Sequence, residues 1–263
     1  MKKLVPIILI LFIIAAFYLV LSKRERVPKK LIFKSAFGKQ GTALGEFNRP
    51  VCLVIKENYL YLVDSANNRI QILKINPDGS LAAESAFGKK SSDLGEFDSA
   101  LGLAVTNNNL YAADTANNRI QILKINPDGS LAADSAFGKK GNGLGEFDRP
   151  RGLTVKNFFL YVTDLGNNRI QILKINPDGS LSAESAFGKK GSGLGEFLNP
   201  SGLIFLRDQL YVMDSGNCRI QIIKINPDGS LAAESAFGKK SSDLGEFDSA
   251  LGLAVTNNNL YAA

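Results

Sequence analysis

Histidine and tryptophan are absent from this chain of 263 residues, and cysteine and methionine occur only twice each. Without histidine, no imidazole can serve as a metal ligand or as a general base near neutral pH. No serine or cysteine has a candidate base partner either, so nucleophilic catalysis has no support. These absences lead us to expect a protein that is not an enzyme and that holds no cofactor and no metal ion.

The two cysteines, Cys52 and Cys218, lie at different positions of an internal repeat, in its first and fourth copies. A disulfide requires Cα atoms within about 7 Å of each other, and repeats three steps apart are not expected to meet that limit. We therefore expect both thiols to be unpaired, and they say little about the redox compartment.

Most of the chain also lacks an excess of charge of either sign. Residues 1–34 hold eight basic residues and one acidic residue, whereas residues 35–263 hold 23 basic and 24 acidic residues. The overall charge of +6 therefore comes from the N-terminal segment. The remainder has no electrostatic basis for binding a polyanion, and we expect no nucleic-acid partner.

Residues 1–30 predict a transmembrane anchor with basic flanks. No charged residue occurs from Leu4 to Ser22, and at about 1.5 Å per residue this run spans roughly 28 Å, close to the hydrocarbon thickness of a bilayer. A cleaved signal peptide is the alternative, although Val20 and Ser22 would make a poor cleavage site. The basic flank after residue 22 favours a cytoplasmic domain, and the short basic N-terminus favours the opposite. We expect a single-pass membrane protein whose main domain is extracytoplasmic.

The rest of the chain is a repeat of 50 residues. The segment NNRIQILKINPDGS begins at Asn67, recurs unchanged at Asn117 and Asn167, and returns with two substitutions at Asn217. In the second copy, short apolar or β-branched runs at 102–106, 110–114, 119–125 and 131–138 predict four strands. The residues between these runs are typical of tight turns. Each repeat therefore predicts a four-stranded antiparallel meander.

Meanders of this period bury both faces by packing on their neighbours around an axis, which predicts an all-β fold, a β-propeller, over residues 31–263. An open β-solenoid is the alternative, but a coil of 50 residues would be unusually long for one. We expect complete blades near residues 51–87, 101–137, 151–187 and 201–237 and a partial blade at 251–263. Residues 224–263 are identical to residues 74–113 and stop within a strand, so we expect a truncated product.

The segment 137–172 contains FG, GEF, GL, LYV and NNRIQI at the spacing of an NHL repeat. Over residues 37–263 the chain resembles NHL-repeat proteins, and this resemblance implies a propeller of six blades, or else five, when complete. Without tryptophan there is no WD dipeptide and no kelch pattern. YVTD at 161–164 is similar to the YWTD repeat of a related six-bladed group.

An aspartate precedes an arginine by five residues in every complete repeat. The pairs are Asp64 and Arg69, Asp114 and Arg119, Asp164 and Arg169, and Asp214 and Arg219. A ring of carboxylates that binds Ca²⁺ is one interpretation. We favour a structural role, in which each aspartate caps the loop between the second and third strands and pairs with its arginine. The reason is that the pair recurs in every blade, whereas a site has to converge at one point.

The copies differ mainly in their loops, where a repeated scaffold can carry selectivity. Our candidate partner-binding residues are Arg49, Arg149, Arg151, Phe158, Phe159 and Arg207. The first three belong to the face formed by the connections between blades, and the last three to the first hairpins on the opposite face. The two phenylalanines are the strongest single anchors.

We therefore expect a non-enzymatic, membrane-tethered binding propeller that presents a loop face to a protein or glycan, comparable to the extracellular sensor domains that NHL repeats form in some bacterial kinases. An alternative is an enzyme whose channel holds a carboxylate-bound divalent metal such as Ca²⁺ and acts on a lactone or sugar acid. RNA binding, known for some animal NHL domains, is the least favoured, because the propeller is close to neutral.

Overall fold

The computed structural model describes residues 36–106, 108–226, 229–241, 246–247, 251–256 and 259–262. The chain divides into two units, Met1–Phe37 and Gly38–Ala263, and the second unit contains the repeats. The membrane segment expected at residues 4–22 lies outside the described residues, as does the expected start of the propeller at residues 31–35. Within the described part of the chain, no helix is long and apolar enough to cross a bilayer.

Four antiparallel sheets of four strands each follow one another along the chain, and we number them blades 1 to 4. Their strands are β3 (Pro50–Lys56), β4 (Tyr59–Asp64), β5 (Arg69–Ile75) and β6 (Leu81–Phe87) in blade 1; β7 (Gly102–Val105), β8 (Asn109–Asp114), β9 (Arg119–Ile125) and β10 (Leu131–Phe137) in blade 2; β11 (Pro150–Lys156), β12 (Phe159–Asp164), β13 (Arg169–Ile175) and β14 (Leu181–Phe187) in blade 3; and β15 (Pro200–Leu206), β16 (Gln209–Asp214), β17 (Arg219–Ile225) and β18 (Leu231–Phe237) in blade 4. The all-β propeller with four-stranded antiparallel blades is thus confirmed.

The remaining elements are short. β1 (Lys39–Gln40) and β2 (Glu46–Phe47) pair in parallel before blade 1, and β19 (Leu253–Thr256) and β20 (Asn259–Ala262) form an antiparallel hairpin after blade 4. Single 3₁₀ turns, η1 (Ser65–Asn67) and η2 (Ser215–Asn217), follow the second strands of blades 1 and 4. The sequence predicts neither the parallel pairing, which lies within a single connection, nor the 3₁₀ turns.

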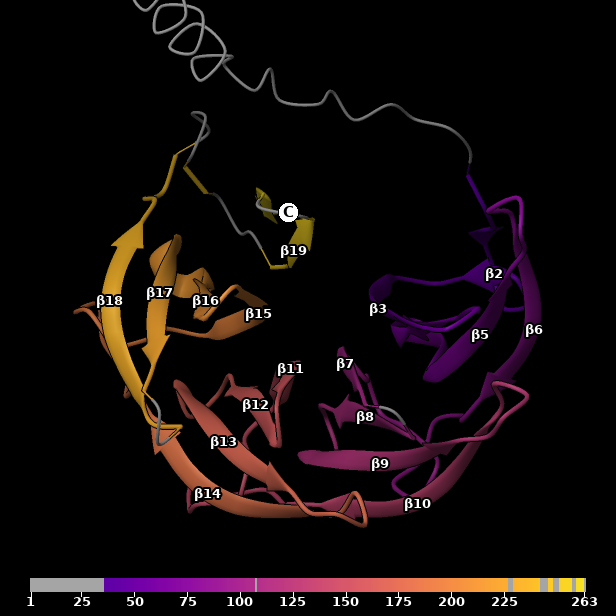
Figure 1. Ribbon diagram of the computed structural model, residues 1–263, viewed down its shortest axis with the longest axis horizontal. Helices are drawn as coiled ribbons and strands as arrows, with labels where there is room; N and C mark the ends of the chain where they lie inside the picture. Colours follow the sequence, from indigo (N-terminus) through magenta and orange to yellow (C-terminus); the bar gives the residue numbers. More distant parts are fainter. Residues whose placement is uncertain are drawn as a thin grey trace, which may run out of the picture. The chain divides into compact units, whose positions relative to one another are not determined.

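The first strand of each blade is its inner strand and the fourth is its outer strand (Figure 1). In chain order, the inner strands β3, β7, β11 and β15 lie next to one another, and the outer strands β6, β10, β14 and β18 lie on the outside (Figure 1). Each inner strand starts where the connection from the previous blade arrives, which we call the connection end. It finishes at the turn into the second strand, which we call the hairpin end.

Neighbouring blades pack through alternate residues of their strands. Tyr61 and Val63 of blade 1 are fully buried in one cluster with Leu103 and Leu110 of blade 2. The Tyr61 hydroxyl donates a hydrogen bond to the Gly129 carbonyl of blade 2 at 3.0 Å. A buried tyrosine hydroxyl needs such a partner, and the corresponding tyrosine of blade 2 makes the same bond to blade 3. These contacts join consecutive blades at the hairpin end.

The glycine-rich connections between blades each carry a phenylalanine that packs beneath them. Phe147, in the connection from blade 2 to blade 3, is fully buried and forms a parallel bridge with Lys140. Its ring meets that of Phe137, at the end of β10, edge to face with centroids 6.4 Å apart. Gly138 follows Phe137 with φ +92, and a Cβ there would lie 2.5 Å from the Phe147 ring. The connection is therefore a compact, anchored loop.

The buried Tyr61 makes the stability of the fold sensitive to alkali. Burial, with the nearby Tyr59, Glu57 and Asp128, raises the pKa of Tyr61 from 10.0 to about 12. The unfolded chain loses this proton above pH 10, whereas the folded chain keeps it until about pH 12, so stability falls through that window. We expect the wild type to lose about 1–2 kcal/mol more than Tyr61→Phe between pH 9.5 and 11.5, measured by urea unfolding. Equal losses in the two proteins would contradict this assignment.

Candidate functional site

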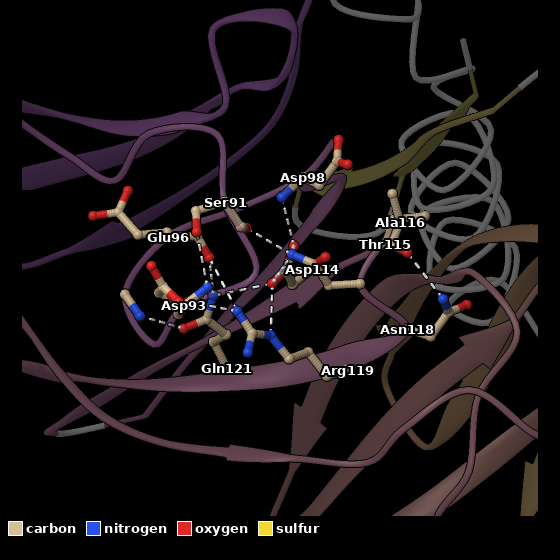
Figure 2. A network of polar contacts seen from close by, with 12 residues as sticks. Ser91, Asp93, Glu96, Asp98, Asp114, Thr115, Ala116, Asn118, Arg119 and Gln121 are labelled. Atoms are coloured by element: carbon tan, nitrogen blue, oxygen red, sulfur yellow. Dashed lines mark hydrogen bonds and ion pairs between the residues drawn. The ribbon is translucent and has the colours of Figure 1, made fainter.

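The recurring aspartate lies at the centre of a polar network at the connection end of each blade. In blade 2, Asp114 is fully buried and its Oδ1 accepts the backbone N–H of Asp98 at 2.8 Å. Its Oδ2 accepts from Arg119 Nε at 2.8 Å and from Gln121 Nε2 at 3.1 Å (Figure 2). Asn117 donates to both oxygens. Four donors saturate the acceptor positions of a carboxylate, so this group is not free to bind a ligand.

The same network recurs in every complete blade. The Nε to Oδ2 distances are 2.8 Å for Arg69 and Asp64, 2.8 Å for Arg119 and Asp114, 2.9 Å for Arg169 and Asp164, and 2.8 Å for Arg219 and Asp214. Burial raises the pKa of Asp64, but hydrogen bonds from Asn48, Asn67, Arg69 and Gln71 outweigh it and leave the pKa below its usual value. Among the described residues, no group of three or more acidic or cysteine side chains could hold a metal ion.

Each aspartate binds a different loop from the one that the sequence predicts. The backbone N–H bound by each aspartate belongs to the connection before the blade, as with Asp148 bound by Asp164 at 2.8 Å. The loop after the aspartate, which was expected to receive the cap, shows no side-chain cap bond at η1 or η2. The physical reason is that the connection folds back over that loop. Each aspartate therefore fastens the connection to its own blade.

A second set of hydrogen bonds links consecutive blades at the same end, and no motif of the sequence indicated it. Asn68 Oδ1 accepts the backbone N–H of Ser99 at 2.9 Å, and Asn118 Oδ1 accepts that of Arg149 at 2.9 Å. Ser99 and Arg149 have positive φ values of 54 and 56. A left-handed residue costs free energy outside glycine, and these bonds hold it in place. They fasten each connection to the preceding blade.

Arg151 is the second residue of the inner strand β11 and is half-buried. The corresponding residues of the other inner strands are Val51, Ser201 and, just before β7, Leu101. Burial lowers the pKa of the Arg151 guanidinium. Among the described residues, no hydrogen bond or ion pair of its side chain is found. A guanidinium that has lost part of its hydration and has no counter-ion is well suited to hold an anion.

Other charged side chains lie at the connection end as well. Arg49 and Arg149 are exposed and precede the inner strands β3 and β11. Arg149 Nε lies 3.4 Å from Asp148 Oδ1. Asp98 gives its backbone N–H to Asp114 while its carboxylate points away from the network (Figure 2). This end of the blades thus combines guanidinium groups with carboxylates.

The three remaining candidates lie at the hairpin end. Phe158 is 74% exposed, whereas Phe159 packs against the core between blades 3 and 4. The carbonyl of Arg207 accepts a hydrogen bond from Lys156 Nζ at 3.1 Å. An inner strand of seven residues, at about 3.3 Å per residue, separates the two ends by roughly 20 Å. The six candidates therefore do not form one site, because Arg49, Arg149 and Arg151 lie at one end and the rest at the other.

Residues 35–230 match the family model described as lactonase, 7-bladed beta-propeller. No curated protein sequence matches the chain. This match contradicts our expectation of a non-enzymatic binding protein and points to an enzyme. The expectation was wrong because the absence of histidine removes imidazole chemistry only, and carboxylates and guanidinium groups remain. The match supports a propeller but does not specifically identify NHL repeats.

Solved structures resemble the chain in fold. A putative 6-phosphogluconolactonase from Bacteroides uniformis has a TM-score of 0.61 at 18% identity, and the matched region covers 84% of this chain and 66% of that protein. A periplasmic gluconolactonase from Pseudomonas aeruginosa has a TM-score of 0.57 at 15% identity, and the matched region covers 85% of this chain and 67% of that protein. A protein from Lactobacillus plantarum has a TM-score of 0.57 at 16% identity, and the matched region covers 74% of this chain and 60% of that protein. The chain thus spans less than two thirds of the first and third of these proteins.

Proposed function

Because the chain belongs to the family of lactonases built as seven-bladed β-propellers, we propose that it hydrolyses a lactone, the cyclic ester of a hydroxy acid. The family match carries this proposal. The reaction adds water to the ester carbonyl, breaks the ring C–O bond and leaves a hydroxy acid. We place it at the connection end, beside Arg151.

Arg151 supports this placement because ester hydrolysis develops negative charge on the carbonyl oxygen. A fixed cation or hydrogen-bond donor stabilises that oxyanion more strongly where water is partly excluded. The half-buried Arg151 guanidinium meets this requirement. The recurring arginines, such as Arg119, do not, because aspartate and backbone carbonyls already occupy them.

A general base is the second requirement, and without histidine we assign it to a carboxylate, which is ionised near neutral pH. The recurring aspartates are saturated with hydrogen bonds, as Asp114 shows. Asp98 and Asp148 occupy the connection end with their carboxylates outside that network, and they are our candidates. In this role the carboxylate accepts a proton from the attacking water, and the leaving ring oxygen receives one.

The test is an assay of the full chain with glucono-δ-lactone and 6-phosphoglucono-δ-lactone, with the released acid followed by a pH indicator and the spontaneous rate subtracted. We expect turnover above the spontaneous rate. Arg151→Gln should lower kcat/KM by about 100-fold, the usual loss when one oxyanion donor is removed. Arg207→Gln, at the hairpin end, is the matched control and should stay within about 3-fold of the wild type.

The outcomes of this assay are distinct. No turnover of any sugar lactone by the wild type would contradict the proposed function. Turnover that Arg151→Gln leaves unchanged would contradict the site and not the activity.

The finer architecture and the location are proposals as well. The family description names seven blades, whereas the resemblance to NHL repeats implies six. The prediction of six blades depends on that resemblance alone. The apolar segment of residues 4–22 supports anchoring in a membrane with the propeller on the extracytoplasmic side. A protein or glycan partner and the absence of a nucleic-acid partner stay predictions.

A further inference from the structure

A cavity lies between blades 1 and 2 at the hairpin end, opposite to the proposed lactonase site. Its volume is about 150 Å³, and its lining includes Lys56, Glu57, Tyr59, Tyr61, Asn108 and Asn126. At about 30 Å³ for each water, this space equals roughly five water molecules. It therefore has room for a few non-hydrogen atoms with hydrogen-bonding groups.

The repeat shows why the space exists between these two blades. Between blades 3 and 4 the corresponding position is taken by Phe205, whose ring meets that of Tyr161 with centroids 5.1 Å apart. Lys156 Nζ lies 5.2 Å from the centre of the same Phe205 ring. Blade 2 has Val105 at this position, packed against the cluster that contains Tyr61. Valine is much smaller than phenylalanine, although Val105 itself is not part of the cavity lining. Between blades 2 and 3 this position is also a valine, Val155, but blade 2 has Thr106 where blade 1 has Lys56. Among blades 1 to 4, blades 1 and 2 are therefore the neighbours that combine the valine with the lysine.

The lysine at the cavity also differs from its equivalent. Lys156 Nζ crosses to blade 4 and binds Asp208 Oδ1 at 2.9 Å. Blade 2 has Asn108 in place of that aspartate, and Lys56 Nζ pairs with Glu57 Oε1 of its own blade at 3.0 Å. The Glu57 side chain is 72% exposed, and such exposed pairs are weak. Among the described residues, no hydrogen bond of the Asn108 side chain is found.

The charges around the cavity favour a neutral ligand. Lys56 brings one positive charge and Glu57 one negative charge, and Asp128 is close enough to influence Tyr61. The cavity is therefore not a cationic site. Its ammonium, carboxylate and amide groups can each donate to or accept from hydroxyl groups. Tyr59 contributes an aromatic wall that is packed on the turn at Gly129.

We propose that this cavity binds a small neutral polyol, either a free molecule of the size of glycerol or the diol edge of a sugar ring. The site is separate from the lactonase chemistry and does not depend on it. Lys56 and Asn108 donate hydrogen bonds to adjacent hydroxyls, and Glu57 accepts one. A phenylalanine in place of Val105 would extend beside Tyr61, as Phe205 does beside Tyr161, and would fill the site.

The test is ligand-observed NMR titration of the full chain with glycerol, methyl β-D-glucoside and gluconate. A neutral ligand that fills so small a space should bind with a Kd of about 1–10 mM. Gluconate, which carries hydroxyls and a negative charge, should bind at least about 5-fold more weakly. If glycerol alone saturates the protein, the ligand of the cavity is a free polyol. If glycerol and methyl β-D-glucoside both saturate it, the cavity also accepts the diol edge of a sugar ring.

Two variants and one control decide the location. Val105→Phe recreates the filled arrangement of blades 3 and 4 and should weaken binding by at least about 10-fold. Asn108→Asp offers Lys56 the partner that Lys156 has, and should weaken binding by about 5-fold without filling the cavity. Lys156→Met is the matched control and should leave the Kd unchanged. Unaltered thermal unfolding would show that the variants are folded.

The proposal fails if none of the neutral probes saturates below about 100 mM, a concentration well above the expected Kd. It also fails if gluconate binds most tightly, or if Val105→Phe and Asn108→Asp both bind like the wild type.

Discussion

Replacement of Asp164 by alanine should lower the free energy of unfolding by about 3–5 kcal/mol, the cost of removing one partner of a buried ion pair. Asp164 is fully buried and accepts from Arg169 Nε at 2.9 Å and from Gln171 Nε2 at 3.0 Å. Alanine leaves both donors, and the backbone N–H of Asp148, without this acceptor. Because a domain is stable by only about 5–15 kcal/mol, the loss is a large share of the total.

Urea unfolding followed by circular dichroism measures this effect, and Asp134→Ala is the matched control. Asp134 lies on the outer strand β10, and its side chain is 35% exposed, 3.8 Å from Lys124 Nζ. Pairs of this kind contribute little, so the control should change stability by less than about 0.5 kcal/mol. A loss below about 1 kcal/mol for Asp164→Ala would show that the aspartate network, which Figure 2 shows for the equivalent Asp114, does not hold the connections in place.

The blades could be predicted from the sequence because their determinants are local. The expected strand at 131–138 is observed as β10, Leu131–Phe137. The turn before it forms as its residues indicate, since Asp128 Oδ1 accepts the N–H of Ser130 at 3.0 Å. Such turn chemistry acts over four or five residues. The same turn residues recur in every repeat, so the sequence predicts one blade for each copy.

The contacts between loops could not be predicted, because they join residues about 26 positions apart. Gln121 accepts the N–H of Gly95 at 2.8 Å, and nothing in the local pattern pairs these two residues. The same limit applies to the site. The sequence indicated Arg151 as one variable loop residue among six, and only the structure shows that it is half-buried and lacks a partner among the described residues. Phe158, the strongest candidate anchor on sequence grounds, lies at the hairpin end instead.

The second large effect is expected from Gly102→Ala, which should destabilise the protein by about 3 kcal/mol, the upper end of the usual cost of overpacking. A Cβ at Gly102 would lie 1.9 Å from the carbonyl oxygen of Arg151 in the next blade. The atom in the way belongs to the backbone of β11, so no rotation of a side chain can relieve the overlap. Blade 3 has to move away from blade 2. Thermal unfolding measures the loss.

Gly252→Ala is the matched control, because Gly252 occupies the same position of the repeat and a Cβ there would meet nothing within 4 Å. It should leave the melting temperature unchanged. The clash at Gly102 also displaces the backbone of Arg151, and a displaced guanidinium stabilises the oxyanion less well. In the lactonase assay, kcat/KM of Gly102→Ala should therefore fall by at least about 10-fold. A variant that loses stability but keeps full activity would show that Arg151 does not act on the substrate. The close approach of two inner strands would then serve packing alone.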